Sequence, residues 1–465
     1  MTKKFPFYLA LVAIGFIFLS ATIDLDDLFN YANQATPDYI NKDNTNGNVI
    51  DDKIATLGRV LFYDKQLSNN MTIACASCHI QANAFSDTEI QSVGLDGGLT
   101  GRHSMRLINA RFADETNFFW DERAATLEEQ TTQPIQDHVE MGFSGTNGDP
   151  DINDLITILS SVDYYDTLFS FAFGDNEITE NRMQLAMAQF IRSIQSFDSR
   201  FDDGLVQVNN INAPFPNYTA EENQGKQLFL DTQPNGGAGC AGCHRPPEFD
   251  IDPQTLNNGI IGVAGDPSAI DLTNTRSPSL RDVTNASGAV NGPFMHDGSL
   301  ASLLDVVNHY NQIPNDPTNT NLDPRLLGPG GQPQNLNFTQ AQKDALVAFL
   351  ETLAGTNVYT DEKWSDPFDP DGSIEIIGGV FSTNDLISES SFQMYPNPVV
   401  NQLNIESPND VYNYAVYNLQ GQQLKTGSLH GSSTVKMSDL PSGIYLFRIT
   451  DSTNKTLFTK KLIKQ

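Results

Sequence analysis

Cys75-Ala76-Ser77-Cys78-His79 gives the chemistry of this chain, and Cys240-Ala241-Gly242-Cys243-His244 repeats it. In the spacing CxxCH, two thiols reach the two vinyl groups of one porphyrin and the adjacent histidine binds the iron. One copy alone could arise by chance, or serve as a zinc half-site or a redox dithiol. Here the two copies contain all four cysteines of the chain, each with its own histidine. We therefore expect two covalently bound c-type haems, held by Cys75, Cys78 and His79 and by Cys240, Cys243 and His244.

A second motif precedes each pentapeptide. Leu57-Gly58-Arg59-Val60-Leu61-Phe62 lies before the first, and Gln224-Gly225-Lys226-Gln227-Leu228-Phe229 lies before the second. Thr219 and Glu222 have the spacing of a capping box, which indicates that a helix begins there. The pattern predicts a duplicated unit of helix, loop and haem, in which the Leu-Phe pair of each helix packs on the porphyrin.

Hydrophobic periodicity divides the chain into two classes of structure. Apolar stripes predict helices over 181–197, after the segment ending at Gly298, and from Thr339. Beyond residue 390, apolar and polar residues alternate between glycine-containing turns, which is typical of strands. We predict a mainly α fold with two cytochrome c-like haem domains, followed by a small all-β sandwich. The expected parts are a signal peptide (1–21), an N-terminal haem domain (22–205), a C-terminal haem domain (215–360), a linker (361–390) and the β-domain (391–465), with Phe201 to Tyr218 joining the haem domains.

The net charge of the chain indicates which binding partners to expect, and its N-terminal residues indicate its cellular location. The 465 residues carry a formal net charge of −30, which excludes nucleic acid as a partner because phosphate binding needs a basic face. An acidic surface suits a basic electron donor, or serves solubility alone. Lys3 and Lys4, the apolar run Phe5 to Leu19 and the small residues Ser20-Ala21 predict a secretory signal. The alternative, an uncleaved anchor, has fewer apolar residues than the roughly 20 that span a bilayer.

Further motifs follow in order along the chain: Phe119-Trp120-Asp121, Val139-Glu140-Met141 and Phe294-Met295-His296-Asp297-Gly298, and in the tail Tyr395-Pro396-Asn397-Pro398 and Gly443-Ile444-Tyr445. Through the first three, with Leu57-Gly58-Arg59 and both CxxCH sites, residues from about 50 to 360 resemble the bacterial di-haem cytochrome c peroxidases and the MauG-like enzymes that mature methylamine dehydrogenase. Through the motifs of the tail, residues 391–465 resemble the C-terminal sorting domain of the type IX secretion system. This second resemblance implies export through the periplasm to the surface or exterior of a Bacteroidetes-type cell, with the secretion machinery as a partner.

The first resemblance implies a cytochrome-c peroxidase. Such an enzyme reduces hydrogen peroxide to water at the N-terminal haem, with electrons that a small cytochrome c or copper protein delivers to the C-terminal haem. Glu140 then matches the distal acid–base residue, Gln130 the glutamine that orients peroxide, and Trp120 the electron bridge between the haems. The alternative for Trp120 is a plain buried aromatic, and for Glu140, taken outside the motif, a solvated acid. Calcium between the haem domains is a further family feature, but this sequence does not identify its ligands.

Two departures from the family pattern concern the sixth ligands of the irons. Leu95 stands where many members carry a histidine that closes the first iron, so we expect that iron to be open, with His103 as the alternative ligand. At the second iron the candidates are Tyr310, as in the maturation enzymes, and Met295. A tyrosine ligand would favour a MauG-like oxidase acting on a protein substrate. A closed first iron would instead favour a surface electron carrier without peroxidase activity.

Overall fold

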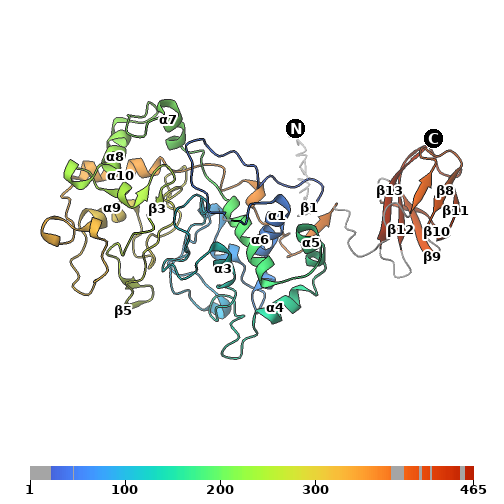
Figure 1. Ribbon diagram of the computed structural model, residues 1–465, viewed down its shortest axis with the longest axis horizontal. Coiled ribbons are helices and arrows are strands. Elements are labelled where there is room, and N and C mark those ends of the chain that lie inside the picture. The colour runs from blue at the N-terminus through green and yellow to red at the C-terminus, as the bar shows by residue number, and fades with distance from the viewer. Residues whose placement is uncertain (1–21, 46, 379–391, 408–410, 419–420, 451–455) are drawn as a thin grey trace, which may run out of the picture. The chain divides into compact units, whose positions relative to one another are not determined.

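The computed structural model describes residues 22–45, 47–378, 392–407, 411–418, 421–450 and 456–465. The chain divides into two compact units, Met1–Gly379 and Val380–Gln465, and each is described by itself (Figure 1). The expected signal peptide, 1–21, and residues 379–390 of the expected linker lie outside the described residues. Among the described helices, none is long and apolar enough to cross a membrane.

Two helix pairs form the centre of the first unit: α1 (Asp52–Tyr63) with α6 (Glu180–Ser193), and α8 (Ala220–Leu230) with α10 (Gln340–Glu351) (Figure 1). The capping box at Thr219 begins α8, as predicted. The other helices are α2 (Cys75–Cys78), α3 (Leu127–Thr132), α4 (Ile152–Leu159), α5 (Asp163–Phe173), α7 (Arg200–Val208) and α9 (Leu303–Asn311). Short 3₁₀ turns are η1 (Lys65–Leu67), η2 (Gln81–Asn83), η3 (Leu95–Gly97), η4 (Gln233–Asn235), η5 (Cys240–Gly242), η6 (Pro324–Leu326), η7 (Pro329–Gly331) and η8 (Glu362–Trp364).

One glycine in each pair explains why the duplicated motif contains it. A β-carbon on Gly58 would overlap the carbonyl oxygen of Ala186 in α6, and one on Gly225 would overlap that of Ala345 in α10. Only glycine lets the two helix backbones approach so closely. The two pairs are therefore the same packing unit used twice, as the repeated motif predicts.

The prediction of a mainly α fold is only partly correct. Residues 98–126 and 271–302 form turns and isolated bridges rather than helices. The first unit also has small sheets, in which β1 (Thr22–Asp24) pairs with β6 (Glu375–Ile377), β2 (His244–Arg245) with β3 (Asp250–Ile251), and β4 (Gly262–Val263) with β5 (Asp266–Ile270). These irregular segments, rather than the helices alone, surround the functional residues.

Two expected linkers belong to the core instead. Residues 361–377 return to the first helix pair: Trp364 is buried, and the hydroxyl of Tyr63 donates to its carbonyl oxygen at 2.6 Å. The parallel pairing of β1 with β6 closes this segment. Between the haem domains, α7 carries the buried Phe201, whose ring packs on buried Phe215 at 5.6 Å. Proline and Asp-Pro steps therefore mark turns of a packed chain here, not free connections.

The C-terminal unit is built of strands, as predicted. Its sheets run in the orders β10-β9-β12-β13 and β11-β8-β7. Both contribute to one apolar core, with Leu403 from the three-stranded sheet and Val416, Phe447 and Leu462 from the other. The strands are β7 (Gln393–Tyr395), β8 (Gln402–Glu406), β9 (Val411–Tyr417), β10 (Gln423–His430), β11 (Ser433–Lys436), β12 (Gly443–Thr450) and β13 (Thr456–Lys464).

Candidate active site

The first CxxCH motif forms one wall of a cavity in the N-terminal half. Helix α2 is a single turn, and the N–H of His79 closes it by donating to the carbonyl oxygen of Cys75 at 3.0 Å. Nδ1 of His79 lies 3.2 Å from the carbonyl oxygen of Phe85, which orients the ring and leaves Nε2 for a metal. Burial lowers the pKa of His79 and so favours the neutral ring that a metal ligand requires. Two thiols and an oriented imidazole on one cavity fit a covalent haem.

The three residues expected to be catalytic all line this same cavity: Trp120, Gln130 and Glu140. Gln130 projects from α3, which Thr126 caps by accepting the N–H of Glu129 at 3.1 Å. Glu140 lies in a turn closed by Asp137, whose carboxylate accepts the N–H of Glu140 at 3.0 Å. The structure thus brings together residues that are 20 positions apart in the sequence.

The environment of Glu140 suits proton transfer near neutral pH. Burial is the main cause that raises the pKa of Glu140 to about 7, and the charge of Asp137 adds to it. Arg123, whose guanidinium lies over the ring of Phe119 at 3.4 Å, acts in the opposite direction. A carboxyl that is half ionised at neutral pH can both take up and release a proton. Glu140 is therefore not the solvated acid of the alternative interpretation.

Leu95 and His103, the two residues considered at the sixth position of the first iron, differ in their relation to the cavity: His103 lines it and Leu95 does not. The N–H of Leu95 donates to the carbonyl oxygen of Glu140 at 3.0 Å, and its side chain packs against Gly142. Leu95 is not among the residues that line the cavity, although the neighbouring Gly94 is. Both ring nitrogens of His103 have partners: Nδ1 lies 2.9 Å from the carbonyl oxygen of Glu89, and Nε2 lies 3.4 Å from Oγ of Ser86.

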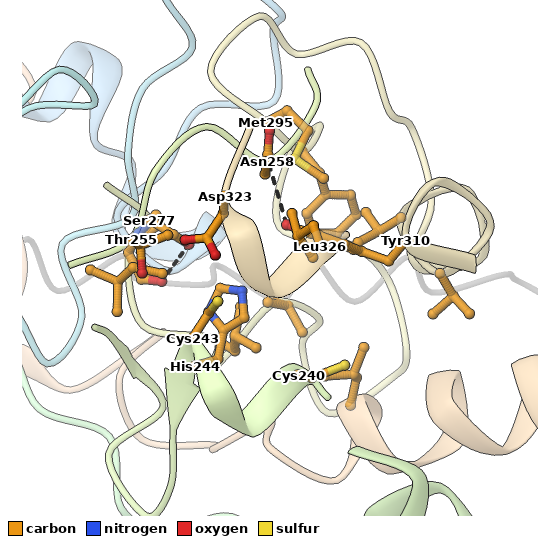
Figure 2. A pocket seen from close by; sticks show the side chains of 18 of the residues that line it. Cys240, Cys243, His244, Thr255, Asn258, Ser277, Met295, Tyr310, Asp323 and Leu326 are labelled. Carbon is orange, nitrogen blue, oxygen red and sulfur yellow. Dashed lines mark hydrogen bonds between the residues drawn. The ribbon is translucent and has the colours of Figure 1, made fainter. Parts of the chain in front are cut away.

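The second CxxCH motif lines a second cavity, shown in Figure 2. Cys240 begins η5, and His244 follows in β2, where it pairs with Ile251 of β3. Burial, with a contribution from Arg325, lowers the pKa of His244 to about 4. Nδ1 of His244 is buried and has no hydrogen-bond partner among the described residues. The buried neutral ring again fits an iron ligand.

Both candidate sixth ligands of the second iron lie in this cavity, across from His244 (Figure 2). Tyr310 projects from α9, and Met295 precedes the His-Asp-Gly turn with a positive φ of 74°. The amide nitrogen of Asn258 donates to both: it lies 3.2 Å from Sδ of Met295 and 3.3 Å from the hydroxyl of Tyr310. The geometry keeps the two candidates adjacent and does not choose between them.

Trp120 lines both cavities. Its Nε1 donates to the carbonyl oxygen of His103 at 2.7 Å, and its own carbonyl oxygen accepts the N–H of Arg276 at 3.1 Å. The indole meets the imidazole of His296 edge to face, with ring centroids 6.3 Å apart. The structure thus holds the Trp120 ring at the boundary that the two cavities share.

Sequence reasoning missed several residues of the site. Asn258, Arg106 and Arg276 carry no recognised motif, and their roles depend on contacts between distant segments. The equal spacing of Ser104 and Leu107 and of Ser277 and Leu280 relates the two segments, but it does not align their arginines. The described residues include no group of three or more His, Cys, Asp or Glu side chains that could hold a metal ion, so they supply no such group for the expected calcium.

Comparison with known proteins identifies two regions of similarity in the chain. Residues 52–209 match the model of the di-haem cytochrome c peroxidase family, and residues 393–465 match the secretion system C-terminal sorting domain. The methylamine utilization protein MauG of Methylorubrum extorquens is 31% identical over 317 residues, which cover 65% of this chain and 78% of that protein. The cytochrome c551 peroxidase of Nitrosomonas europaea is 26% identical, over 65% of this chain and 80% of its own length. A crystal structure of a MauG-like protein associated with microbial copper homeostasis is similar, with a TM-score of 0.57, 26% identity and coverage of 72% of this chain and 99% of that chain.

Proposed function

This chain belongs to the family of the di-haem cytochrome c peroxidases and MauG, and on that premise we propose that it reduces hydrogen peroxide to water with electrons from a small redox protein. The observation that carries the proposal is the single cavity that Glu140, Gln130 and Trp120 share with the first CxxCH motif. The reaction consumes two electrons and two protons for each peroxide and releases two waters. The chain must therefore supply one proton-transfer group and one electron path at the same cavity.

The residues that would hold the two haems are the cysteines and histidines of the two motifs, through thioether bonds and axial ligation. When bound, each haem supplies an iron that exchanges single electrons, and the first also supplies a coordination position for peroxide. Because Leu95 has no lone pair and packs on Gly142, we expect that position to be open in the oxidised protein.

Glu140 moves the proton. As a carboxylate it accepts the proton of the peroxide oxygen nearer the cofactor, and as an acid it returns that proton to the departing oxygen, which leaves as water. Gln130, on the same cavity, donates a hydrogen bond that orients the peroxide between them. Asp137 fixes the turn of Glu140 by accepting its N–H and raises its pKa, so the proton is held at neutral pH.

Trp120 passes electrons from the second cavity to the first. Its hydrogen bond to the carbonyl oxygen of His103 and its edge contact with His296 hold the indole in one orientation. We assign electron entry to the C-terminal half, as the family resemblance implies, from a small cytochrome c or copper protein. The match of residues 393–465 to a sorting domain indicates export to the cell surface or secretion. We further propose a type IX route through the periplasm, so that the donor meets the enzyme outside the cytoplasm.

A MauG-like oxidation of a protein substrate is the second candidate. It is favoured by Tyr310, which faces the second cavity opposite His244, and by the similarity to MauG proteins (Figure 2). The spectrum of the oxidised protein separates the two candidate ligands. If Tyr310 binds the second iron, Tyr310→Phe changes the spectrum and Met295→Leu does not. A change only in Met295→Leu assigns the methionine and removes the observation that favours the MauG-like reaction.

The proposed function is tested by mixing the oxidised protein with hydrogen peroxide in a stopped-flow spectrophotometer, then adding a reduced small cytochrome c. We expect a spectral change before any electron is added, and then oxidation of two donors for each peroxide consumed. The absence of donor oxidation over a range of cytochromes and copper proteins would contradict the peroxidase proposal. A reaction that begins only after reduction would show instead that another side chain closes the first iron.

A further inference from the structure

Residues 102–109 and 275–282 share a serine and a leucine at the same spacing, and residues of both segments line both cavities. Asn109 accepts the N–H of Ser196 through its side-chain oxygen at 2.9 Å. At the equivalent position, Asp282 accepts the N–H of Gly355 at 2.8 Å. When the two segments are aligned in this way, Arg106 takes the position of Ser279. The first segment therefore has a cation where the second has a small hydroxyl. At this aligned position, only the first segment carries a charge.

Arg106 lines both cavities and lacks an ion-pair partner in the part of the chain that the structure describes. Its Nη2 donates to the carbonyl oxygen of Ser279 at 3.3 Å, while its Nε is buried without a hydrogen bond. Burial is the main cause that lowers the pKa of Arg106 to about 10. Asp282 is the principal acid acting on it, and burial raises the pKa of that carboxyl to about 6, but the described structure shows no ion pair between the two side chains.

A second arginine at the same boundary, Arg276, has partners for its guanidinium. Arg276 also lines both cavities, but its guanidinium donates to the carbonyl oxygen of Asn117 and lies over the ring of Phe118 at 4.4 Å. A buried guanidinium normally has an anion or several acceptors, because leaving its donors unpaired costs free energy. Arg106 therefore points to an anion that is not part of the polypeptide.

We propose that Arg106 binds haem propionate at the boundary between the cavities and thereby raises the midpoint potentials of both haems. The vinyl groups and the two propionates of a c-type haem are on opposite edges of the porphyrin, so the propionates of haems held by the two CxxCH motifs would lie away from those motifs. A cation beside an iron disfavours its ferric form, which carries the additional positive charge. The inference rests on haem binding alone and not on reduction of peroxide.

The test is a spectroelectrochemical titration of the haem-loaded full chain without peroxide. Arg106→Gln removes the charge and keeps a hydrogen-bond donor, so we expect both midpoint potentials to fall. A roughly tenfold change in the one-electron equilibrium constant corresponds to about 59 mV. Arg106→Lys keeps the charge and should stay near the wild-type potentials. Arg111→Gln, which removes a guanidinium that pairs with exposed Asp43, is the matched control and should leave both potentials unchanged.

Unchanged potentials in a fully loaded Arg106→Gln protein overturn the proposal. A shift at one haem alone also overturns it, because the site is defined by contact with both cavities. If the glutamine variant does not load haem, Arg106→Lys decides: lowered potentials despite the retained charge exclude the electrostatic role. Since peroxide is absent, the result is independent of whether the protein is a peroxidase.

Discussion

Replacement of Glu140 by glutamine tests the assignment of the proton-transfer group. The pKa of Glu140 is raised to about 7, so the carboxylate fraction is about a half at pH 7 and about a tenth at pH 6. Because the carboxylate is the form that accepts the proton, the rate constant for peroxide should rise about tenfold from pH 5 to pH 6 and level off above pH 8. In Glu140→Gln this dependence should disappear, and the rate should fall by roughly 10²–10⁴-fold.

The assay is stopped-flow mixing of the oxidised protein with peroxide between pH 5 and pH 9. Glu129→Gln is the matched control, because Glu129 is an exposed carboxylate on α3, next to Gln130, and does not line the cavity. Asp137→Asn keeps an oxygen that can accept the N–H of Glu140 but removes a charge that raises its pKa, so the inflection should move to lower pH. A rate independent of pH in the wild-type protein, or a full rate in Glu140→Gln, would refute the reasoning.

The raised pKa of Glu140 also affects folding stability. With rising pH the expected rate increases, whereas this contribution to stability decreases. The folded-state pKa of Glu140 lies above the ordinary value of 4.5, so its protonated form favours the folded state. This contribution is fully present below about pH 4.5 and is lost as the pH rises through about 7. Above about pH 7, the ionised form of Glu140 that the proposed reaction needs therefore lowers the stability of the folded state.

Three further outcomes are expected. Cys75→Ser or Cys240→Ser should each lower the covalent haem content by one, measured by absorbance after acidic organic extraction. Full release of haem from the wild-type protein would contradict covalent attachment. Gly58→Ala should lower the free energy of unfolding by about 1–3 kcal/mol in denaturant titration, whereas Gly101→Ala, where a β-carbon meets open space, should change it little. Deletion of residues 391–465 should leave the haem spectrum intact and stop export, and loss of the spectrum would show instead that the tail supports the first unit.

The sequence predicts this fold best at positions where packing allows only one type of residue. Gly58 and Gly225 mark the repeated helix pair because no side chain fits between the backbones. The alternation after residue 390 predicts the strands of the tail for the same reason, since each strand packs one face on a shared core. Trp364 could not be placed in this way. Its segment looks like a linker because it contains Asp-Pro and Gly-Gly steps, and only the contact with the distant Tyr63 shows that it is core.

The residues of the site also fall into two groups, those that a motif identifies and those that only the fold brings into place. Residues with intrinsic chemistry, such as His79 and Glu140, can be identified from motifs. Asn258 has no chemistry of its own, and it becomes important only because folding places it between Met295 and Tyr310. Its amide donates to either candidate ligand, which the spacing of those two residues in the sequence cannot reveal.

Leu95 shows how a departure from a family pattern acquires a physical meaning. The sequence alone shows only that Leu95 supplies no ligand, because a leucine side chain cannot bind iron. The structure adds a positive role: the backbone N–H of Leu95 donates to the carbonyl oxygen of Glu140, and its side chain fits against Gly142. The loop that would carry a closing ligand is therefore fixed to the turn that carries the proton-transfer group. A movement of this loop would displace Glu140 as well, so the open first site and the acid–base residue that we propose depend on the same contacts.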